Sequence, residues 1–122
     1  MDFENDKPIY IQLMDDIKAG IINETYQPGD RLPSIRDYAK DMMVNPNTGQ
    51  KAYAELEQEG YIYSKRGIGY FVNEDPDTVN KLKYSYLDKE INDLVDKLVN
   101  MKYEKEEIIK RIKESLWLNL KM

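Results

Sequence analysis

Five polar or basic residues in the middle of the chain could form a recognition surface. Asn47, Thr48 and Gln50 stand close together, and Lys65 and Arg66 follow a short distance later. Amide and hydroxyl groups donate and accept hydrogen bonds, and basic groups bind anions, so this set suits a polar, negatively charged surface. The chain has no cysteine and no histidine, which removes thiol nucleophiles, the usual general base and the commonest zinc ligand. We therefore expect a binding protein without catalytic residues, metal sites or cofactors.

The first three residues lead a predicted helix that covers residues 45–59. Asn45 is a good N-cap, and Pro46 suits the first helical position. Gly60 stands where a C-terminal glycine would end the helix. The buried stripe follows from i, i+3, i+4 and i+7 spacing and consists of Gly49, Ala52, Tyr53 and Leu56. The polar residues therefore begin an amphipathic helix.

A predicted β-hairpin at residues 61–72 follows this helix directly. Aromatic and β-branched runs flank a basic tip made of Lys65, Arg66 and Gly67, a pattern that predicts two strands and a turn. A polar helix tip followed by a basic hairpin is typical of a winged helix-turn-helix, whose helix enters the major groove while the hairpin contacts the DNA backbone or minor groove. We expect double-stranded DNA as the partner.

The segments before the helix complete this motif. Apolar residues at every fourth position predict a helix over residues 8–23, and the sequence 27–30 has proline and glycine at the central positions of a type II turn. Ser34 can cap a second helix of about nine residues, with Asp37 in a capping-box position. This short helix, a turn ending at Val44 and the next helix have helix-turn-helix spacing.

Composition is compatible with this interpretation, although net charge first argues against it. The chain has 122 residues, of which 41% are apolar and 34% charged, typical of a folded protein. It has no long apolar run and no signal-like N-terminus, so we expect a cytoplasmic protein that does not contact membranes. The net charge is −5, but residues 28–72 carry six basic and six acidic groups. Arg36, Lys51, Lys65 and Arg66 would have to form the basic face, and a dimer would double their contacts.

Four separated blocks of sequence resemble the N-terminal domain of GntR-family transcriptional regulators. They are Gly-Asp-Arg-Leu-Pro-Ser-Ile-Arg-Asp-Tyr-Ala (29–39), Val-Asn-Pro-Asn-Thr (44–48), Ala-Tyr-Ala-Glu-Leu-Glu-Gln-Glu-Gly (52–60) and Arg-Gly-Ile-Gly-Tyr-Phe-Val (66–72). The second block and the short tail are most similar to the YtrA subfamily, small repressors that often control transporter operons. The resemblance implies a mainly α (α+β) fold, with a winged helix-turn-helix domain at residues 1–74 and a two-helix dimerisation domain at residues 75–122.

The resemblance also implies roles for individual residues. Arg36 matches an arginine that contacts DNA, and Ser34 lies at the phosphate-facing end of the same helix. The full set of predicted DNA contacts is Ser34, Arg36, Asn47, Thr48, Gln50, Lys51, Lys65, Arg66 and Gly67. Pro46 and Gln50 occupy positions that are arginine in many relatives, so arginine-to-guanine readout is not carried over. Met43 replaces a usual turn glycine and Gly49 a usual valine, which predicts a strained turn and a looser helix.

Two amphipathic stretches occupy the rest of the chain. One starts at Asp77 or Thr78 and runs to about Asn100, and the other covers residues 104–120. About 45 residues cannot enclose much core alone, so we expect a second copy to cover them in a two-fold dimer on a palindromic operator. The predicted dimer contacts are Leu82, Tyr86, Ile91, Leu94, Leu98, Ile108, Ile112, Leu116 and Trp117.

Other interpretations of these residues stay open. The polar tip and the basic hairpin could be ordinary solvated surface, in which case the chain would be a winged-helix module that binds another protein. Tyr84, Tyr86, Tyr103 and Trp117 could pack an interface or line a pocket for a small-molecule effector that the sequence does not identify. By contrast, Tyr38, Tyr53, Tyr61 and Tyr70 fall on core-facing positions, which argues against a surface for stacking single-stranded nucleic acid.

Overall fold

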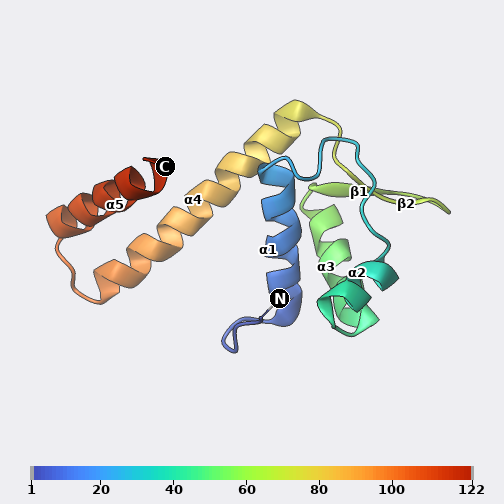
Figure 1. The fold of residues 1–122 in the computed structure, drawn as a ribbon, viewed down its shortest axis with the longest axis horizontal. Coiled ribbons are helices and arrows are strands. Elements are labelled where there is room, and N and C mark those ends of the chain that lie inside the picture. Colours follow the sequence, from blue (N-terminus) through green and yellow to red (C-terminus); the bar gives the residue numbers. More distant parts are fainter. Residues whose placement is uncertain (1, 122) are drawn as a thin grey trace. The chain divides into compact units, whose positions relative to one another are not determined.

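The computed structural model describes residues 2–121. Its elements follow one another as α1 (Ile9–Ile22), α2 (Ile35–Met42), α3 (Pro46–Gln58), β1 (Ile62–Lys65), β2 (Gly69–Val72), α4 (Pro76–Asn100) and α5 (Lys105–Leu120) (Figure 1). The chain divides into two compact units, an N-terminal unit up to residue 83 and a C-terminal unit from residue 84 onward.

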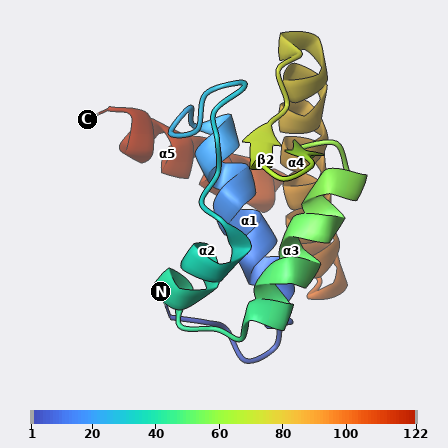
Figure 2. The same cartoon turned by 90° about the vertical axis from the view of Figure 1, so that its right-hand side faces the viewer.

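The core of the N-terminal unit lies between α1, α3 and the wing. Leu13 and Ile17 of α1, Tyr53 and Leu56 of α3, and Val72 of β2 are its largest fully buried side chains. Figures 1 and 2 both show α2 beside the first turns of α3. The predicted stripe of α3, from Gly49 to Leu56, is buried throughout. The sequence pattern therefore predicted this helix and its inward face correctly.

Glycine at position 49 permits a close approach between two helices. A Cβ atom added to Gly49 would lie 3.4 Å from the Cβ of Ala39 and 3.4 Å from the Cγ2 of Ile35, both on α2. Contact at that distance leaves room for one methyl group and little more. Glycine thus lets α2 pack tightly against α3, which offsets part of its cost in helix propensity.

The predicted helix ends are present in the structure. The Asn45 side chain accepts a hydrogen bond from the amide of Asn47 at 2.8 Å, and the Ser34 hydroxyl accepts one from the amide of Asp37 at 3.1 Å. Gly60, just past α3, has a φ of +90°. Met43 ends α2 in the left-handed conformation, with φ 59° and ψ 43°, so the strained turn expected there is confirmed.

The wing is a two-stranded antiparallel sheet with an additional segment along one side. Ile62 pairs with Val72, and Lys65 pairs with Gly69 at the tip. Residues 30–32 run beside β2, where the Leu32 amide donates to the Tyr70 carbonyl and the Val72 amide to the Asp30 carbonyl, both at 2.9 Å. The turn at residues 27–30 that feeds this segment has the predicted hydrogen bond, from the Asp30 amide to the Gln27 carbonyl at 3.0 Å.

The segment before α1 is held by one buried side chain, that of Gln12. The Gln12 amide group donates to the carbonyls of Glu4 and Lys7, at 2.9 and 2.8 Å, and its oxygen accepts from the Glu4 amide at 2.8 Å. Phe3 also packs against the core. A polar residue of α1 thus turns inward and satisfies backbone groups of the segment that precedes the helix.

The first turns of α4 belong to the N-terminal unit. Val79 and Leu82 pack against its core, and the Tyr61 hydroxyl donates to the Leu82 carbonyl at 3.4 Å. Asp75 caps the helix by accepting from the Thr78 hydroxyl at 2.8 Å and the Asp77 amide at 3.0 Å, which lowers the pKa of the Asp75 carboxyl. The helix therefore starts slightly earlier than the expected cap at Asp77 or Thr78.

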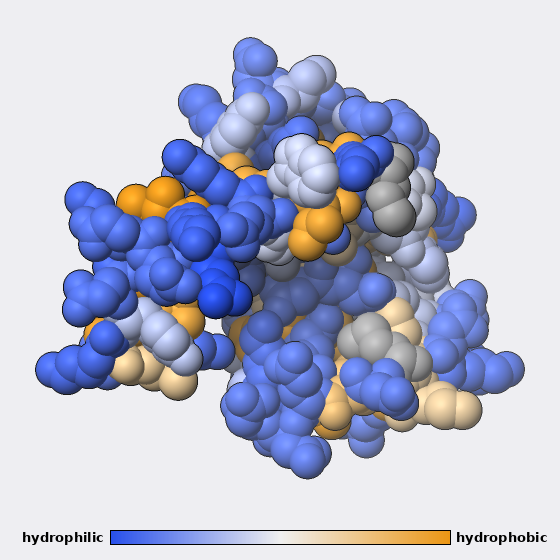
Figure 3. Space-filling model, turned by 60° about the vertical axis from the view of Figure 1, so that its left-hand side comes forward, coloured by the Kyte–Doolittle hydropathy of each residue, from blue (hydrophilic) through white to orange (hydrophobic). Residues whose placement is uncertain are grey.

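The C-terminal unit consists of the remainder of α4 and of α5. None of the described residues in these two helices is buried. Large apolar side chains are exposed along both helices. They are Tyr84, Leu87, Ile91, Leu94, Val95, Val99, Ile109, Ile112, Leu116, Trp117, Leu118 and Leu120. Figure 3 shows apolar side chains reaching the surface among mainly hydrophilic ones. Among the described helices, none is both long and apolar enough to cross a membrane.

Candidate nucleic-acid interface

The leading turn of α3 presents hydrogen-bonding side chains to solvent. Asn47 and Gln50 are exposed and Thr48 is half-buried. Asn47 and Gln50 lie three residues apart and share one face, while the opposite face carries the buried stripe. The Asn45 side chain caps the helix, and the side chains of Asn47 and Gln50 are exposed to solvent.

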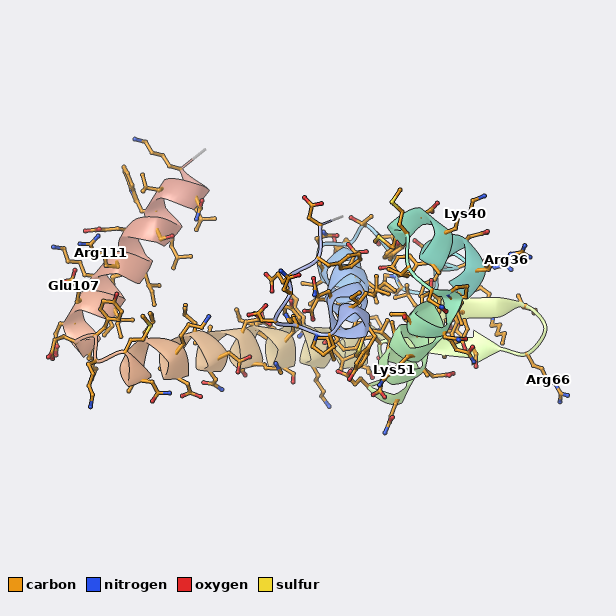
Figure 4. The ribbon with its side chains drawn as sticks, turned by 90° about the horizontal axis from the view of Figure 1, so that it is seen from below. Arg36, Lys40, Lys51, Arg66, Glu107 and Arg111 are labelled. Atoms are coloured by element: carbon orange, nitrogen blue, oxygen red, sulfur yellow. The ribbon has the colours of Figure 1, made fainter. Side chains whose placement is uncertain are left out.

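Two basic residues of α2 extend this surface. Arg36 and Lys40 are both exposed and lie one helical turn apart, so their side chains share a face. Figure 4 shows both projecting outward on the side toward which Arg66 also points. Ser34, by contrast, uses its hydroxyl to cap α2. Sequence reasoning found Arg36 but missed Lys40, although the i, i+4 spacing was available as a signal.

The two basic residues of the wing differ in what they contact. The Lys65 ammonium lies 4.6 Å from the centroid of the Phe71 ring and 5.8 Å from that of Tyr63, so it folds back over the wing's aromatic pair. Arg66 is exposed at the tip. Gly67 follows it with a φ of +75°, which the second central residue of a type II turn requires. The tip therefore offers one projecting guanidinium.

Lys51 is turned away from the other cations. Its ammonium lies 4.1 Å from the centroid of the Tyr10 ring on α1, and in Figure 4 it projects on a different side from Arg36 and Arg66. The cation–π contact joins the first turn of α1 to the second turn of α3. Lys51 thus has a structural contact of its own, besides the DNA contact predicted for it.

Carboxylates of α3 are concentrated at the opposite end of the helix. Glu57 accepts from the amide and hydroxyl of Ser64, at 3.0 and 2.7 Å, and Glu59 pairs with Lys18 at 3.0 Å. At 1.5 Å per residue, Glu57 lies about 15 Å along the helix from Asn47. The near-neutral charge of residues 28–72 is therefore distributed unevenly: these carboxylates connect α3 to β1 and α1, and the polar tip lies away from them.

Buried tyrosines hold α2, α3 and the wing in fixed relative positions. The ring of Tyr53 lies 5.7 Å from that of Tyr38 and meets that of Tyr70 edge-on at 5.1 Å. The Tyr53 hydroxyl donates to the Pro33 carbonyl at 2.7 Å, and the Tyr38 hydroxyl to Asp16 at 2.8 Å. Burial, chiefly, raises the pKa of both phenols. As predicted, these rings form core and are not a stacking platform.

Tyr103 and Trp117, two of the aromatic residues suggested for an effector pocket, line separate surfaces of the C-terminal unit. Tyr103 lines a groove of about 500 Å³ with Leu98, Ile108, Ile112 and Ser115, where Glu107 pairs with Arg111 at 2.9 Å. That ion pair lowers the pKa of Glu107. Trp117 lies on a separate, shallow surface with Lys113, Glu114 and Leu118.

The fold and this surface define a winged helix-turn-helix DNA-binding protein. Residues 9–72 match the family model described as "Bacterial regulatory proteins, gntR family". The chain therefore belongs to the GntR family, whose members are DNA-binding transcriptional regulators and not enzymes.

Individual relatives agree with this assignment over most of the chain. It is 36% identical over 111 residues to the uncharacterized HTH-type transcriptional regulator YhcF of Bacillus subtilis (strain 168), which covers 91% of this chain and 92% of that protein. A solved GntR family transcriptional regulator from Listeria monocytogenes is 36% identical, with a TM-score of 0.83, and covers 92% of this chain and 98% of that one. The chain is also 41% identical over 78 residues to the HTH-type transcriptional repressor YtrA of Bacillus subtilis (strain 168), covering 64% of this chain and 60% of that protein. This similarity supports the YtrA subfamily.

Proposed function

We propose that the protein is a homodimeric repressor that binds a palindromic operator through α3 and the wing. The observation that carries this proposal is the exposed, hydrogen-bonding tip of α3 beside three cations, Arg36, Lys40 and Arg66, that project on one side of the N-terminal unit. The similarity to a protein named as a repressor supports the direction of regulation. A DNA-binding role also fits the expected location in the cytoplasm.

Each part of the surface has a distinct task in this proposal. The Asn47 and Gln50 amides reach base edges in the major groove, where a planar amide can form two hydrogen bonds with adenine. Arg36 binds backbone phosphates and fixes the register of the helix. Arg66 contacts the backbone or the minor groove beside the half-site. Thr48 and Lys51, at the edge of the tip, contact the phosphate backbone of the DNA.

Dimerisation is proposed because the C-terminal unit exposes so much apolar surface. At 100° per residue, Leu87, Ile91 and Leu94 share one face of α4, and Val79 and Leu82 share a different face that packs in the N-terminal unit. The exposed stripe needs a second surface to cover it. We assign the partner contacts to that stripe of α4 and to Ile108, Ile112 and Leu116 of α5, with Trp117 at its edge.

A dimer would also compensate for the low charge of the DNA-contacting surface. One N-terminal unit offers few phosphate contacts, and affinity rises steeply with the number of phosphates neutralised. Two units joined through α4 and α5 would double those contacts and would meet half-sites about one DNA turn apart.

Selection of bound sites from random duplexes, combined with the solution mass of the full-length protein, tests this proposal. We expect a palindrome whose two half-sites have a fixed spacing and which is bound by two chains. Arg36→Ala should weaken binding to every sequence, whereas Lys97→Ala, in the exposed part of α4, is the matched control that should not. A monomer at micromolar concentration, or recovery of no preferred sequence, would contradict it. A stable complex with another protein and no DNA shift would favour the protein-interaction module.

A further inference from the structure

The short segment before α2 contacts the wing through one long side chain. Arg31 pairs with Phe71 of β2 through the backbone, and its Nη2 atom donates to the carbonyl oxygen of Ile68 at 2.5 Å. Ile68 belongs to the loop between β1 and β2, so the guanidinium reaches from the body of the N-terminal unit to the wing tip. A hydrogen bond from a charged donor is among the stronger kinds in proteins.

The neighbouring glycine makes room for this contact. Gly69 has a φ of +148°, and a Cβ atom added there would lie 3.3 Å from the Nε and 3.4 Å from the Nη2 of Arg31. A side chain at position 69 would press on the guanidinium as well as strain the backbone. The glycine at this end of the loop therefore serves the arginine contact in addition to the turn.

The wing has one other side-chain anchor near its tip, the hydrogen bonds from Ser64 of β1 to Glu57 of α3, and the loop itself gains support from Arg31. Residues 64–68 are all exposed, and an isolated two-stranded hairpin is marginally stable in water. On the other side, the segment that carries Arg31 is anchored by the buried side chain of Leu32 and by the hydrogen bond from Tyr53 to the Pro33 carbonyl at 2.7 Å.

We propose that Arg31 is a positioning residue for DNA binding, which holds the wing tip so that Arg66 meets the duplex in a fixed place. This inference rests on the proposed DNA-binding function. Ordering a flexible loop on binding costs affinity, and holding that loop in its bound conformation beforehand removes the cost. Arg31 thus acts through Arg66. The alternative is a direct contact between Arg31 and a DNA phosphate, and the experiment must distinguish the two roles.

A double-mutant cycle in the full-length protein separates the two roles. Operator affinity is measured at several salt concentrations for the wild type, Arg31→Ala, Arg66→Ala and the double variant. We expect Arg31→Ala to lower affinity about tenfold, and the double variant to bind no more weakly than the weaker single variant. Lys40→Ala combined with Arg66→Ala is the control, and there the losses should multiply.

Hydrogen exchange of the wing gives a readout that does not depend on DNA. In Arg31→Ala, the Ile68 amide, which donates to the Lys65 carbonyl at 3.0 Å, should exchange faster while the unfolding midpoint of the whole protein stays the same. The positioning role would be overturned if the affinity losses of Arg31→Ala and Arg66→Ala multiplied in the double variant and its salt slope fell further. Unchanged exchange of the Ile68 amide in Arg31→Ala would overturn it as well. Failure of the wild type to bind any DNA would contradict the proposed function and leave the exchange result to decide on Arg31.

Discussion

The two units of this chain bury their apolar residues to very different extents. In the N-terminal unit, Leu13, Tyr53 and Leu56 are fully buried, and every buried side-chain polar atom among the described residues has a hydrogen-bond partner. In the C-terminal unit, α4 and α5 leave large apolar side chains in solvent: the exposed fraction is 44% for Leu94, 60% for Trp117 and 79% for Leu120. The N-terminal unit thus buries its own apolar side chains, whereas the C-terminal unit exposes apolar surface that we propose a second chain covers.

Disrupting the exposed stripe of the C-terminal unit should have the largest effect. Replacing Ile91 and Leu94 together by aspartate places two charges on the surface that we assign to the dimer. We expect a monomer at micromolar concentration and a loss of operator affinity of about a hundredfold or more, because the second unit no longer binds at high effective concentration. Sedimentation and DNA titration measure the two effects.

Asp96→Ala, on the polar side of α4, is the matched control and should leave both quantities unchanged. If the double aspartate variant stays dimeric, then the association surface lies elsewhere and the contrast between the two units loses its explanation.

Truncation in the buried core comes next in size. Leu56 has no exposed surface, so Leu56→Ala should lower the free energy of unfolding by about 2 to 5 kcal/mol. Leu118→Ala, at a residue that is 62% exposed in the C-terminal unit, should change it by less than about 0.5 kcal/mol. Denaturant titration of both variants tests whether Leu56 and Leu118 differ in burial in solution as they do in the structure. Equal losses would show that Leu118 is covered in solution.

Substitution of Gly49 probes how tightly the N-terminal unit is packed. Gly49→Val should cost about 1 to 3 kcal/mol, because its branched methyl groups press on Ala39 and Ile35. Gly49→Ala should be neutral or stabilise by up to about 1 kcal/mol, since a single methyl fits and helix propensity improves. Hydrogen exchange over residues 47–56 would show in addition whether α3 is looser than α1, as the glycine predicts. Tolerance of valine would mean that α2 moves aside easily.

Relief of the strained turn should have the smallest effect. Met43 is 91% exposed and left-handed, so its side chain contributes little packing while its backbone is strained. Met43→Gly should raise the free energy of unfolding by about 0.5 to 1 kcal/mol, measured by thermal or denaturant unfolding. A destabilised glycine variant would indicate that the methionine side chain makes contacts in solution.

Features determined by short stretches of sequence were predictable. The Asn45 cap with Pro46 beside it, the terminating Gly60 and the basic turn of the wing each depend on residues within a few positions of one another. The inward stripe of α3 follows from helical periodicity alone. The family resemblance depends on the same local blocks, and so the class of protein could be inferred before its structure.

The site was predictable in its types of residue and less so in its geometry. Arg36, Asn47, Gln50 and Arg66 are exposed as expected. The spacing of Arg36 and Lys40 on one helix face was already present in the sequence, whereas the position of Lys51 over Tyr10 became evident only when α1 and α3 were packed together.

The sequence by itself thus determined the helices, the caps, the polar tip and the wing of this protein, because those signals act over one or two turns of chain. Tertiary structure decided which contacts form between distant segments. Arg31 reaches Ile68, Gln12 holds the N-terminal segment, and α4 gives its first turns to the N-terminal unit. Such contacts depend on which faces meet once the core has formed, and periodicity within one element does not carry that information.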